Sequence, residues 1–273
     1  MSDPLFVIPA DRLPPGFAET LDEMPATIAE PKAAATVVLM RDADDGLQVL
    51  LLKRHRSSGF VPGAYVFPGG RIDTADGDER LLASCAVPER GAVAAHFWFG
   101  AVRELFEETG VLLARNAEGE WAPDASSSDA LEAWREKLMS DEAGLIDVVA
   151  AERLSIVLDD VAYFAHWITP EPEPRRYDTR FFAAALPPGR VIRPDAREMV
   201  DAVWVTPADA LERFSAGRLP MVFPTVRTLQ DLAHYESVEI ALRELRAKPV
   251  AAVQPRLVRT AGGVGIVIDG EER

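Results

Sequence analysis

Runs of hydrophobic residues divide much of the chain into short predicted strands separated by turn residues. The stretch from Ala34 to Met40 is almost wholly apolar, Asp42-Ala43-Asp44-Asp45-Gly46 has the composition of a turn, and Leu47 to Lys53 is again mostly apolar. Two apolar runs joined by a turn rich in Asp and Gly predict an antiparallel hairpin. Later runs of the same kind predict three more sheet strands, at 163–168, 179–186 and 200–205.

A helical period replaces this pattern from about residue 92 onward. The residues that would form the buried stripe of this helix are Val102, Leu105, Phe106, Thr109 and Leu112 or Leu113. Glu104, Glu107 and Glu108 fall at positions i, i+3 and i+4, so the three carboxylates share the opposite face. Gly110 follows them directly and closes the helical turn.

The remaining segments predict further helices and a terminal hairpin. Helices are predicted at 78–84, 126–138, 207–216 and 225–234, and a further helix or a turn is predicted at 141–153. Those at 126–138 and 141–153 would form an added lid or cap, and Thr206 is the expected N-cap of the helix that begins at Pro207. Residues 250–268 predict strand, turn and strand, whereas the proline-rich and acidic residues 1–32 predict an irregular arm.

The three glutamates on one helical face indicate a metal site. Like charges at i and i+4 repel by a few tenths of a kcal/mol, so a bound cation would relieve the strain of stacking them. Carboxylate oxygens are ligands that Mg²⁺ and Mn²⁺ prefer. The alternative is an exposed charged helix in which Arg103 and Glu107 form an ion pair. Gly69 and Gly70 favour the metal site, because glycine lets the backbone approach a ligand closely.

The segment Arg103-Glu104-Leu105-Phe106-Glu107-Glu108-Thr109-Gly110-Val111, with Phe67-Pro68-Gly69-Gly70 upstream, resembles the Nudix box, G-x5-E-x7-R-E-U-x-E-E-x-G-U, where U is a bulky aliphatic residue. The second half of the box matches position by position. In the first half, Asp76 stands where the family has glutamate, and 26 residues separate it from Arg103 where the usual box has seven. Nineteen residues therefore interrupt the motif.

An insertion at this place is typical of one Nudix branch, the long-insert branch that contains the mammalian peroxisomal acyl-CoA diphosphatase. Three other segments, at 59–66, 167–170 and 175–182, resemble that branch, and the resemblance covers roughly residues 33–235. It implies an α+β fold, a Nudix-type α/β/α sandwich with a mixed sheet, helical insertions at about 77–95 and 126–153, and a C-terminal β-hairpin extension. The expected organisation is an arm at 1–32, a Nudix domain at 33–246 and an extension at 247–273.

The resemblance also implies roles for individual residues. Glu107 and Glu108 would ligate Mg²⁺ or Mn²⁺, and Glu104 would be a third ligand or the base that activates water. Arg103 would orient the carboxylates, and the backbone of Gly70 would be a further ligand. Because the general base of some members lies outside the box, Glu198 is a candidate for it; the alternative is an ordinary loop acid before a strand.

Two basic clusters could bind the phosphates of a substrate. Arg54 lies in Lys53-Arg54-His55-Arg56, and Arg175 and Arg176 lie in a segment that resembles the family. Guanidinium groups suit phosphates because they donate two parallel hydrogen bonds. The alternative for each cluster is a set of solvated charges that balances the acidic surface.

The composition fits a globular enzyme. The chain has 273 residues, 48% of them hydrophobic, and a formal charge of −15. Such an acidic chain is not expected to bind nucleic acid or anionic membranes. No apolar run is long enough to span a bilayer, and residues 1–15 lack the pattern of a signal segment, so we expect a cytoplasmic location. The resemblance also allows a homodimer, because dimers are common among relatives.

These observations together predict a metal-dependent hydrolase that splits the diphosphate linkage of a nucleoside diphosphate derivative. Coenzyme A or an acyl-CoA is the leading substrate, and the products would be 3′,5′-ADP and an (acyl-)phosphopantetheine. Two alternatives stay open. One is a Nudix pyrophosphatase for NADH or ADP-ribose, and the other is a catalytically silent Nudix module that binds a nucleotide.

Overall fold

The computed structural model describes residues 6–10, 13, 17–21, 27–56, 62–85, 87–88 and 93–269. The chain forms two compact units. The larger consists of 34–164 and 180–250, and the smaller consists of 1–33, 165–179 and 251–273. Strands β8 (Ala162–Ile168) and β9 (Tyr177–Ala185) run through both units.

The larger unit is built on a mixed sheet with the strand order β10-β3-β2-β9-β8. The predicted hairpin is confirmed as β2 (Lys32–Ala43) and β3 (Gly46–Arg54), and β10 (Met199–Val205) pairs with β3. Two short strands, β4 (Tyr65–Val66) and β5 (Gly69–Arg71), pair with β3 and β2. Residues 37–40 and 49–52 are fully buried, because helices cover both faces of the sheet, and this explains why these strands are continuously hydrophobic rather than alternating.

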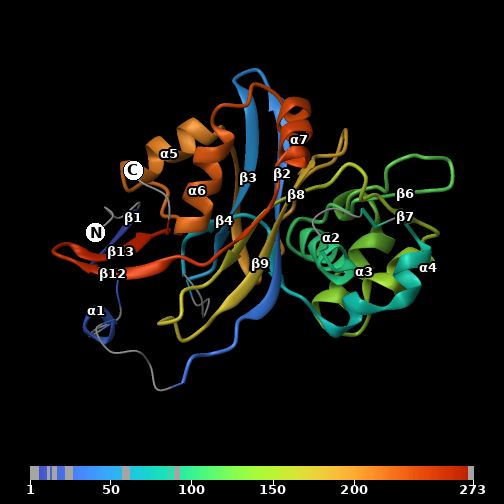
Figure 1. The fold of residues 1–273 in the computed structure, drawn as a ribbon. Coiled ribbons are helices and arrows are strands. Elements are labelled where there is room, and N and C mark those ends of the chain that lie inside the picture. The colour runs from blue at the N-terminus through green and yellow to red at the C-terminus, as the bar shows by residue number, and fades with distance from the viewer. Residues whose placement is uncertain are drawn as a thin grey trace. The chain divides into compact units, whose positions relative to one another are not determined.

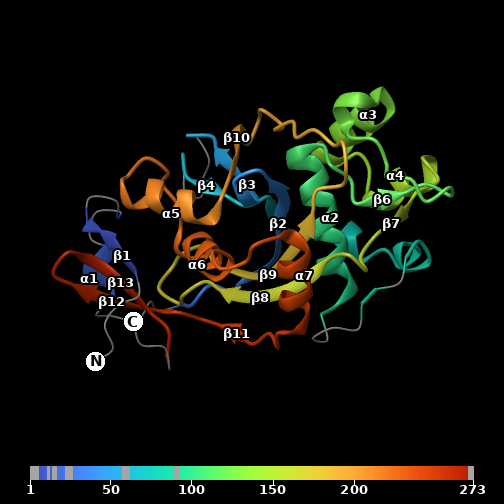
Figure 2. The same cartoon turned by 90° about the horizontal axis from the view of Figure 1, so that it is seen from above.

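Helices lie on both sides of this sheet. Helix α2 (Ala95–Thr109) lies on one side, and α5 (Pro207–Ser215) and α6 (Phe223–Leu232) lie on the other, as Figures 1 and 2 show. This is the expected α/β/α arrangement. Thr206 caps α5 by accepting a hydrogen bond from the backbone N–H of Asp209, as predicted. The expected start of α2 at Ala92 and part of the 59–66 segment lie outside the described residues.

The insertions are helical, as predicted. Within the interrupted box are two 3₁₀ turns, η2 (Thr74–Gly77) and η3 (Glu79–Ala83). After α2 come β6 (Ala114–Arg115), η4 (Ala125–Ser127), α3 (Asp129–Met139), α4 (Leu145–Ala151) and β7 (Ser155–Ile156). One helix was missed by the sequence analysis, α7 (Val238–Ala247), although Ser237 caps it and its apolar residues have a helical period.

The smaller unit contains a sheet with the order β1-β13-β12, a short helix α1 (Phe17–Thr20) and β11 (Ala252–Val253). The predicted terminal hairpin is confirmed as β12 (Arg256–Thr260) and β13 (Gly263–Val267). The prediction of an irregular arm was wrong for β1 (Phe6–Pro9), which pairs antiparallel with β13. Pro9 is compatible with this strand because β1 lies at the edge of its sheet.

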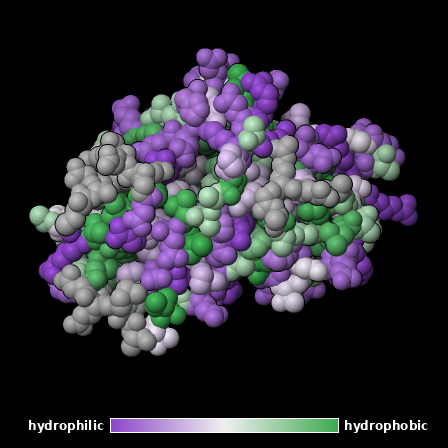
Figure 3. Space-filling view, in the orientation of Figure 1, coloured by the Kyte–Doolittle hydropathy of each residue, from purple (hydrophilic) through white to green (hydrophobic). Residues whose placement is uncertain are grey.

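The surface in Figure 3 shows hydrophobic residues in scattered groups among hydrophilic ones. Large hydrophobic side chains that are exposed include Val191 and Val200. Among the described residues, no helix is both long and apolar enough to cross a membrane.

Candidate active site

Helix α2 presents the carboxylates of the box toward the glycines of β5. Trp98, Phe99 and Phe106 are fully buried and anchor the opposite face of the helix in the core. The helix ends at Gly110, whose φ of 77° lies in the left-handed region and whose N–H donates to the carbonyl of Phe106. Glycine at this position is the usual way to stop a helix, so the box sequence itself fixes where the last carboxylate stands.

Arg103 is the centre of the charge arrangement and is only 4% exposed. Its Nε and Nη2 donate to Oδ1 and Oδ2 of Asp76, both at 2.9 Å, and its Nη1 lies 3.1 Å from carboxylate oxygens of Glu104 and Glu107. Burial alone would lower the pKa of Arg103, but these carboxylates more than offset that effect and raise it. The guanidinium therefore stays charged and holds Glu104 and Glu107 on one side while Asp76 fixes it from the other.

Asp76 reaches Arg103 despite the residues inserted between them. Its side chain is 1% exposed, and its Oδ2 also accepts a hydrogen bond from the backbone N–H of Asp73 at 2.8 Å. The inserted residues therefore do not separate Asp76, in the first half of the box, from Arg103, in the second half. The structure gives this shorter acid the role of anchoring Arg103, which the sequence analysis had left open.

The two glycines of β5 are required because the backbone passes close to the carboxylates and to β2. The N–H of Gly69 donates to Oε2 of Glu108 at 2.8 Å. A Cβ on Gly69 would lie 2.3 Å from the carbonyl oxygen of Ala35, and a Cβ on Gly70 would lie 2.6 Å from both carboxylate oxygens of Glu104. Any side chain at position 70 would occupy the space in front of Glu104.

The carboxylates are protonated more readily than free glutamate. Burial is the main cause, and it raises the pKa of Glu104 to about 8 and that of Glu107 to about 7. The pKa of Glu108 is raised well above its usual value by burial and by the nearby charge of Glu104, although the Gly69 N–H and Arg54 act in the opposite direction. Burial therefore disfavours the charged form of each carboxylate, because water no longer stabilises it.

This donor set fits a divalent cation. Among the residues that the structure describes, no three His, Cys, Asp or Glu side chains already form a group that could hold a metal ion. Glu104 and Glu107 are turned to Arg103, and Glu108 is turned to Gly69. Even so, three carboxylates lie beside a glycine backbone, and burial raises their pKa values, an effect that a bound cation would oppose by favouring their charged form.

Arg54 lies near Glu108, and Glu198 lies beside Arg54. Arg54 stands at the end of β3, and its charge acts on Glu108. Its Nη2 lies 3.9 Å from Oε2 of Glu198, whose side chain is 70% exposed. The carbonyl of Glu198 accepts a hydrogen bond from the N–H of His55, so the segment that precedes β10 is held against the end of β3. The structure thus brings together two of the sequence-predicted residues from distant parts of the chain.

Arg175 and Arg176 belong to the smaller unit. Arg176 is buried, and its Nε and Nη1 donate to the carbonyls of Thr169 and Ala29 at 3.0 and 2.8 Å. These bonds hold the backbone of the smaller unit, and the expected role of Arg176 in phosphate binding stays a prediction. Arg175 is exposed, and its contact with substrate stays a prediction.

One residue near the site was missed, Arg135 of α3. Its Nε donates to the carbonyl of Glu107 at 2.8 Å. A signal for it was present in the sequence, because Leu131, Arg135 and Leu138 fall at i, i+4 and i+7 and therefore share the buried face of the helix. An arginine on the apolar face of a helix indicates that its guanidinium is buried and bonds to a buried polar group.

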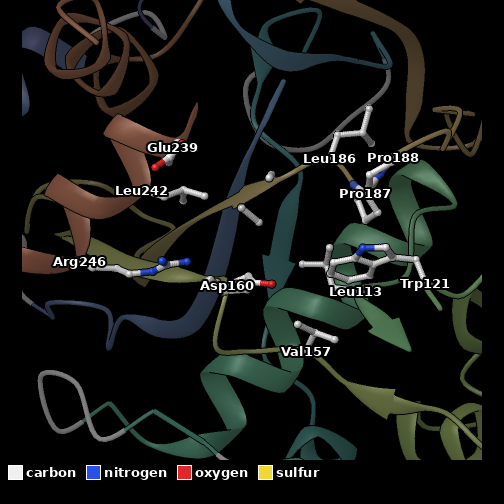
Figure 4. Close-up of a pocket in the computed structure, with 13 residues that line it drawn as sticks. Leu113, Trp121, Val157, Asp160, Leu186, Pro187, Pro188, Glu239, Leu242 and Arg246 are labelled. Atoms are coloured by element: carbon white, nitrogen blue, oxygen red, sulfur yellow. The ribbon is translucent and has the colours of Figure 1, made fainter. Parts of the chain in front are cut away.

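A cavity of about 260 Å³ lies elsewhere in the larger unit. Figure 4 shows Leu242 and Arg246 of α7 on one side of it and Leu113 and Trp121 on the other. It is near the end of β9, where the N–H of Leu186 bonds to the carbonyl of Met40. Since Gly70 pairs with Ala35 of the same strand β2, this point lies five residues, or roughly 17 Å, along β2 from the glycine loop.

Comparisons with known proteins agree with the geometry. The model of the NUDT19 Nudix domain matches residues 79–232. Human acyl-coenzyme A diphosphatase NUDT19 is 27% identical, over 84% of this chain and 72% of its own length. Putative nudix hydrolase 7 of Caenorhabditis elegans is 29% identical, over 85% of this chain and 70% of its own length.

A solved structure shows the same fold. The crystal structure of a NUDIX hydrolase from Alicyclobacillus acidocaldarius superposes with a TM-score of 0.68 at 29% identity, and the match covers 82% of this chain and all of that one. Nudix hydrolases generally use divalent metal ions, as the donor set here also suggests. The family model spans more than half of the chain, and the box residues occupy one site. The chain therefore belongs to the Nudix hydrolases, in the family of the NUDT19 Nudix domain.

Proposed function

We propose that this enzyme hydrolyses the diphosphate linkage of coenzyme A or an acyl-CoA and releases 3′,5′-ADP and the corresponding phosphopantetheine. The observation that carries the reaction type is the set of three glutamates on α2, two of them held by Arg103 and the third by the N–H of Gly69 in β5. Support for the substrate comes from the family model and from the human relative, which is named an acyl-coenzyme A diphosphatase.

Glu104, Glu107 and Glu108 would hold Mg²⁺ or Mn²⁺, with the backbone of Gly70 as a further ligand. When bound, such a cation neutralises charge on the diphosphate and makes a water molecule more acidic. The Nη1 of Arg103 donates to Glu104 and Glu107 and so orients their carboxylates. The hydrogen bond from Nε to Asp76 holds the guanidinium in this orientation. These contacts position the ligands before substrate arrives, so little reorganisation is needed.

Arg54 is the proposed phosphate contact of the larger unit, and Arg175 is a second one. Glu198 is the proposed base outside the box. Its exposed carboxylate and its place next to Arg54 would let it accept a proton from water near the diphosphate. Glu104 is the alternative base, because it shares a helical face with Glu107 and Glu108.

Product analysis tests this proposal. The purified protein is incubated with Mg²⁺ or Mn²⁺ and, separately, with CoA, an acyl-CoA, NADH and ADP-ribose, and Glu107→Gln is the control. We expect 3′,5′-ADP and a phosphopantetheine from the CoA compounds and no release by the control. Cleavage of NADH or ADP-ribose alone would keep the diphosphate chemistry and reject the CoA substrate. No cleavage of any compound by the wild type would favour a binding module.

A further inference from the structure

Helix α2 ends with two carboxylates in its last turn, which is an unfavourable place for negative charge. The last carbonyls of a helix lack partners within the helix and carry a partial negative charge. Glu107 and Glu108 stand in this turn, and α2 has no basic residue there. The groups that hold this end in place must therefore come from other parts of the chain.

Arg135 supplies the positive charge at this end. It lies on the buried face of α3, its side chain is 1% exposed, and its Nε donates to the carbonyl of Glu107 at 2.8 Å. Its Nη1 lies 3.5 Å from a carboxylate oxygen of Glu132. Burying a guanidinium is unfavourable unless its N–H groups form hydrogen bonds. The hydrogen bond to the carbonyl of Glu107 is therefore part of what stabilises Arg135 in its buried position.

The same guanidinium also holds the segment that carries the proposed base. The Nη2 of Arg135 donates to the carbonyl of Arg193 at 2.8 Å, and the N–H of Arg193 donates to the carbonyl of Thr109 at 2.9 Å. A few residues later, Oδ1 of Asp195 accepts the backbone N–H of Glu198 at 2.6 Å. The last turn of α2 and the segment 193–198 are thus joined by the side chain of Arg135 and by one backbone hydrogen bond.

We propose that Arg135 is a positioning residue for the metal ligands. Its hydrogen bonds go to two backbone carbonyls and to Glu132, not to the carboxylates of Glu107 and Glu108. By bonding to the backbone of Glu107 and of Arg193, it fixes the last turn of α2 relative to the segment 193–198, and so sets the place of the Glu107 and Glu108 carboxylates. This inference rests on the proposed function for its catalytic consequence, but its effect on cation binding can be measured separately.

The test compares Arg135→Met and Arg135→Lys with Arg190→Met. Arg190 is a matched control because its guanidinium likewise donates to backbone carbonyls, those of Ala122, Trp121 and Pro188, and none of them belongs to α2. Mn²⁺ affinity is measured by titration calorimetry, unfolding by thermal melting, and kcat and KM with an acyl-CoA.

We expect Arg135→Met to weaken Mn²⁺ binding about tenfold, the lower range seen when groups that orient metal ligands are removed. It should lower kcat about tenfold and change KM less than about twofold. Arg135→Lys should recover part of the affinity, because it keeps the charge but cannot bridge two carbonyls. Arg190→Met should melt earlier and retain wild-type Mn²⁺ affinity.

Equal Mn²⁺ affinity in Arg135→Met and Arg190→Met would overturn the inference. If Arg135→Met does not fold, wild-type Mn²⁺ affinity and kcat in Arg135→Lys would overturn it, because a lysine cannot make both carbonyl contacts. A wild-type protein that cleaves no diphosphate would reject the proposed function instead, and the Mn²⁺ titrations would still decide the role of Arg135.

Discussion

The β5–α2 region of the larger unit and the turn between β8 and β9 in the smaller unit each bury one arginine, but they use it differently. Arg103 faces the carboxylates of Asp76, Glu104 and Glu107. Arg176 faces the carbonyls of Ala29 and Thr169. Neutral carbonyls satisfy Arg176 without leaving excess charge. Around Arg103 one cation meets several anions, so charge remains for a ligand to neutralise. Burial of an arginine is thus no sign of function until its partners are known.

The largest expected effect comes from removing one of the excess charges. Glu107→Gln or Glu108→Gln should lower turnover at least ~100-fold, because each loses charge stabilisation at the metal. Both should fold, since glutamine keeps a carbonyl acceptor for Arg103 or for the N–H of Gly69. Initial rates and melting curves are the measurements. Glu212→Gln on the surface of α5 is the control, and near-normal rates in a folded Glu107 or Glu108 variant would contradict the assignment.

The anchor of Arg103 comes next. Asp76→Asn removes the buried partner of a buried cation, so we expect a loss of about 3 kcal/mol in unfolding free energy, as for other broken buried pairs, and about tenfold lower turnover. Asp73→Asn is the comparison, because Asp73 is partly exposed and its oxygen lies 3.4 Å from the guanidinium. That change should cost less than about 1 kcal/mol in denaturant unfolding. Equal losses from both would show that Asp76 has no special role.

Substitutions of the two arginines in the smaller unit should have different effects, one on the free energy of unfolding and the other on substrate binding. Arg176→Met removes two buried hydrogen bonds, so the unfolding free energy should fall by about 2 kcal/mol while KM changes equally for CoA and dephospho-CoA. Arg175→Ala should raise KM about fivefold more for CoA, which carries the 3′-phosphate, than for dephospho-CoA. Steady-state kinetics with both substrates decide this, and the reverse pattern would restore Arg176 as the phosphate contact.

A further expected effect is the pH dependence of stability in metal-free protein. Folding raises the pKa of Glu104 to about 8 and that of Glu107 to about 7, from 4.5. Between these values the folded state binds more protons than the unfolded state, so stability falls as pH rises from about 5 to about 8. The increase in melting temperature on adding Mn²⁺ should grow over the same window. Glu104→Gln should flatten both trends, and an unchanged pH profile in this variant would exclude Glu104 as their source.

Local signals in the sequence predicted most of the larger unit. The hairpin of β2 and β3, the Thr206 cap and the end of α2 at Gly110 each depend on a few neighbouring residues. Helix α7 also had such signals, which were overlooked. Strand β1 could not be found in this way, because its pairing with β13 joins opposite ends of the chain.

For the site, the sequence predicted the glutamates but not the contacts that hold them. The box spacing placed Glu104, Glu107 and Glu108 on one face. Nothing in that spacing tells that Asp76 still reaches Arg103, or that Arg135 bonds to Glu107. These contacts depend on how the insertions fold back onto α2, which is a tertiary property.

The contact between Asp76 and Arg103 explains how the box tolerates an interruption. Lengthening the connection from seven residues to the 26 found here raises its loop-closure entropy cost by only about 1 kcal/mol. The two hydrogen bonds between Asp76 and Arg103 hold the two ends of that loop together. The box can therefore accept additional residues at this position without displacing the proposed metal ligands on α2.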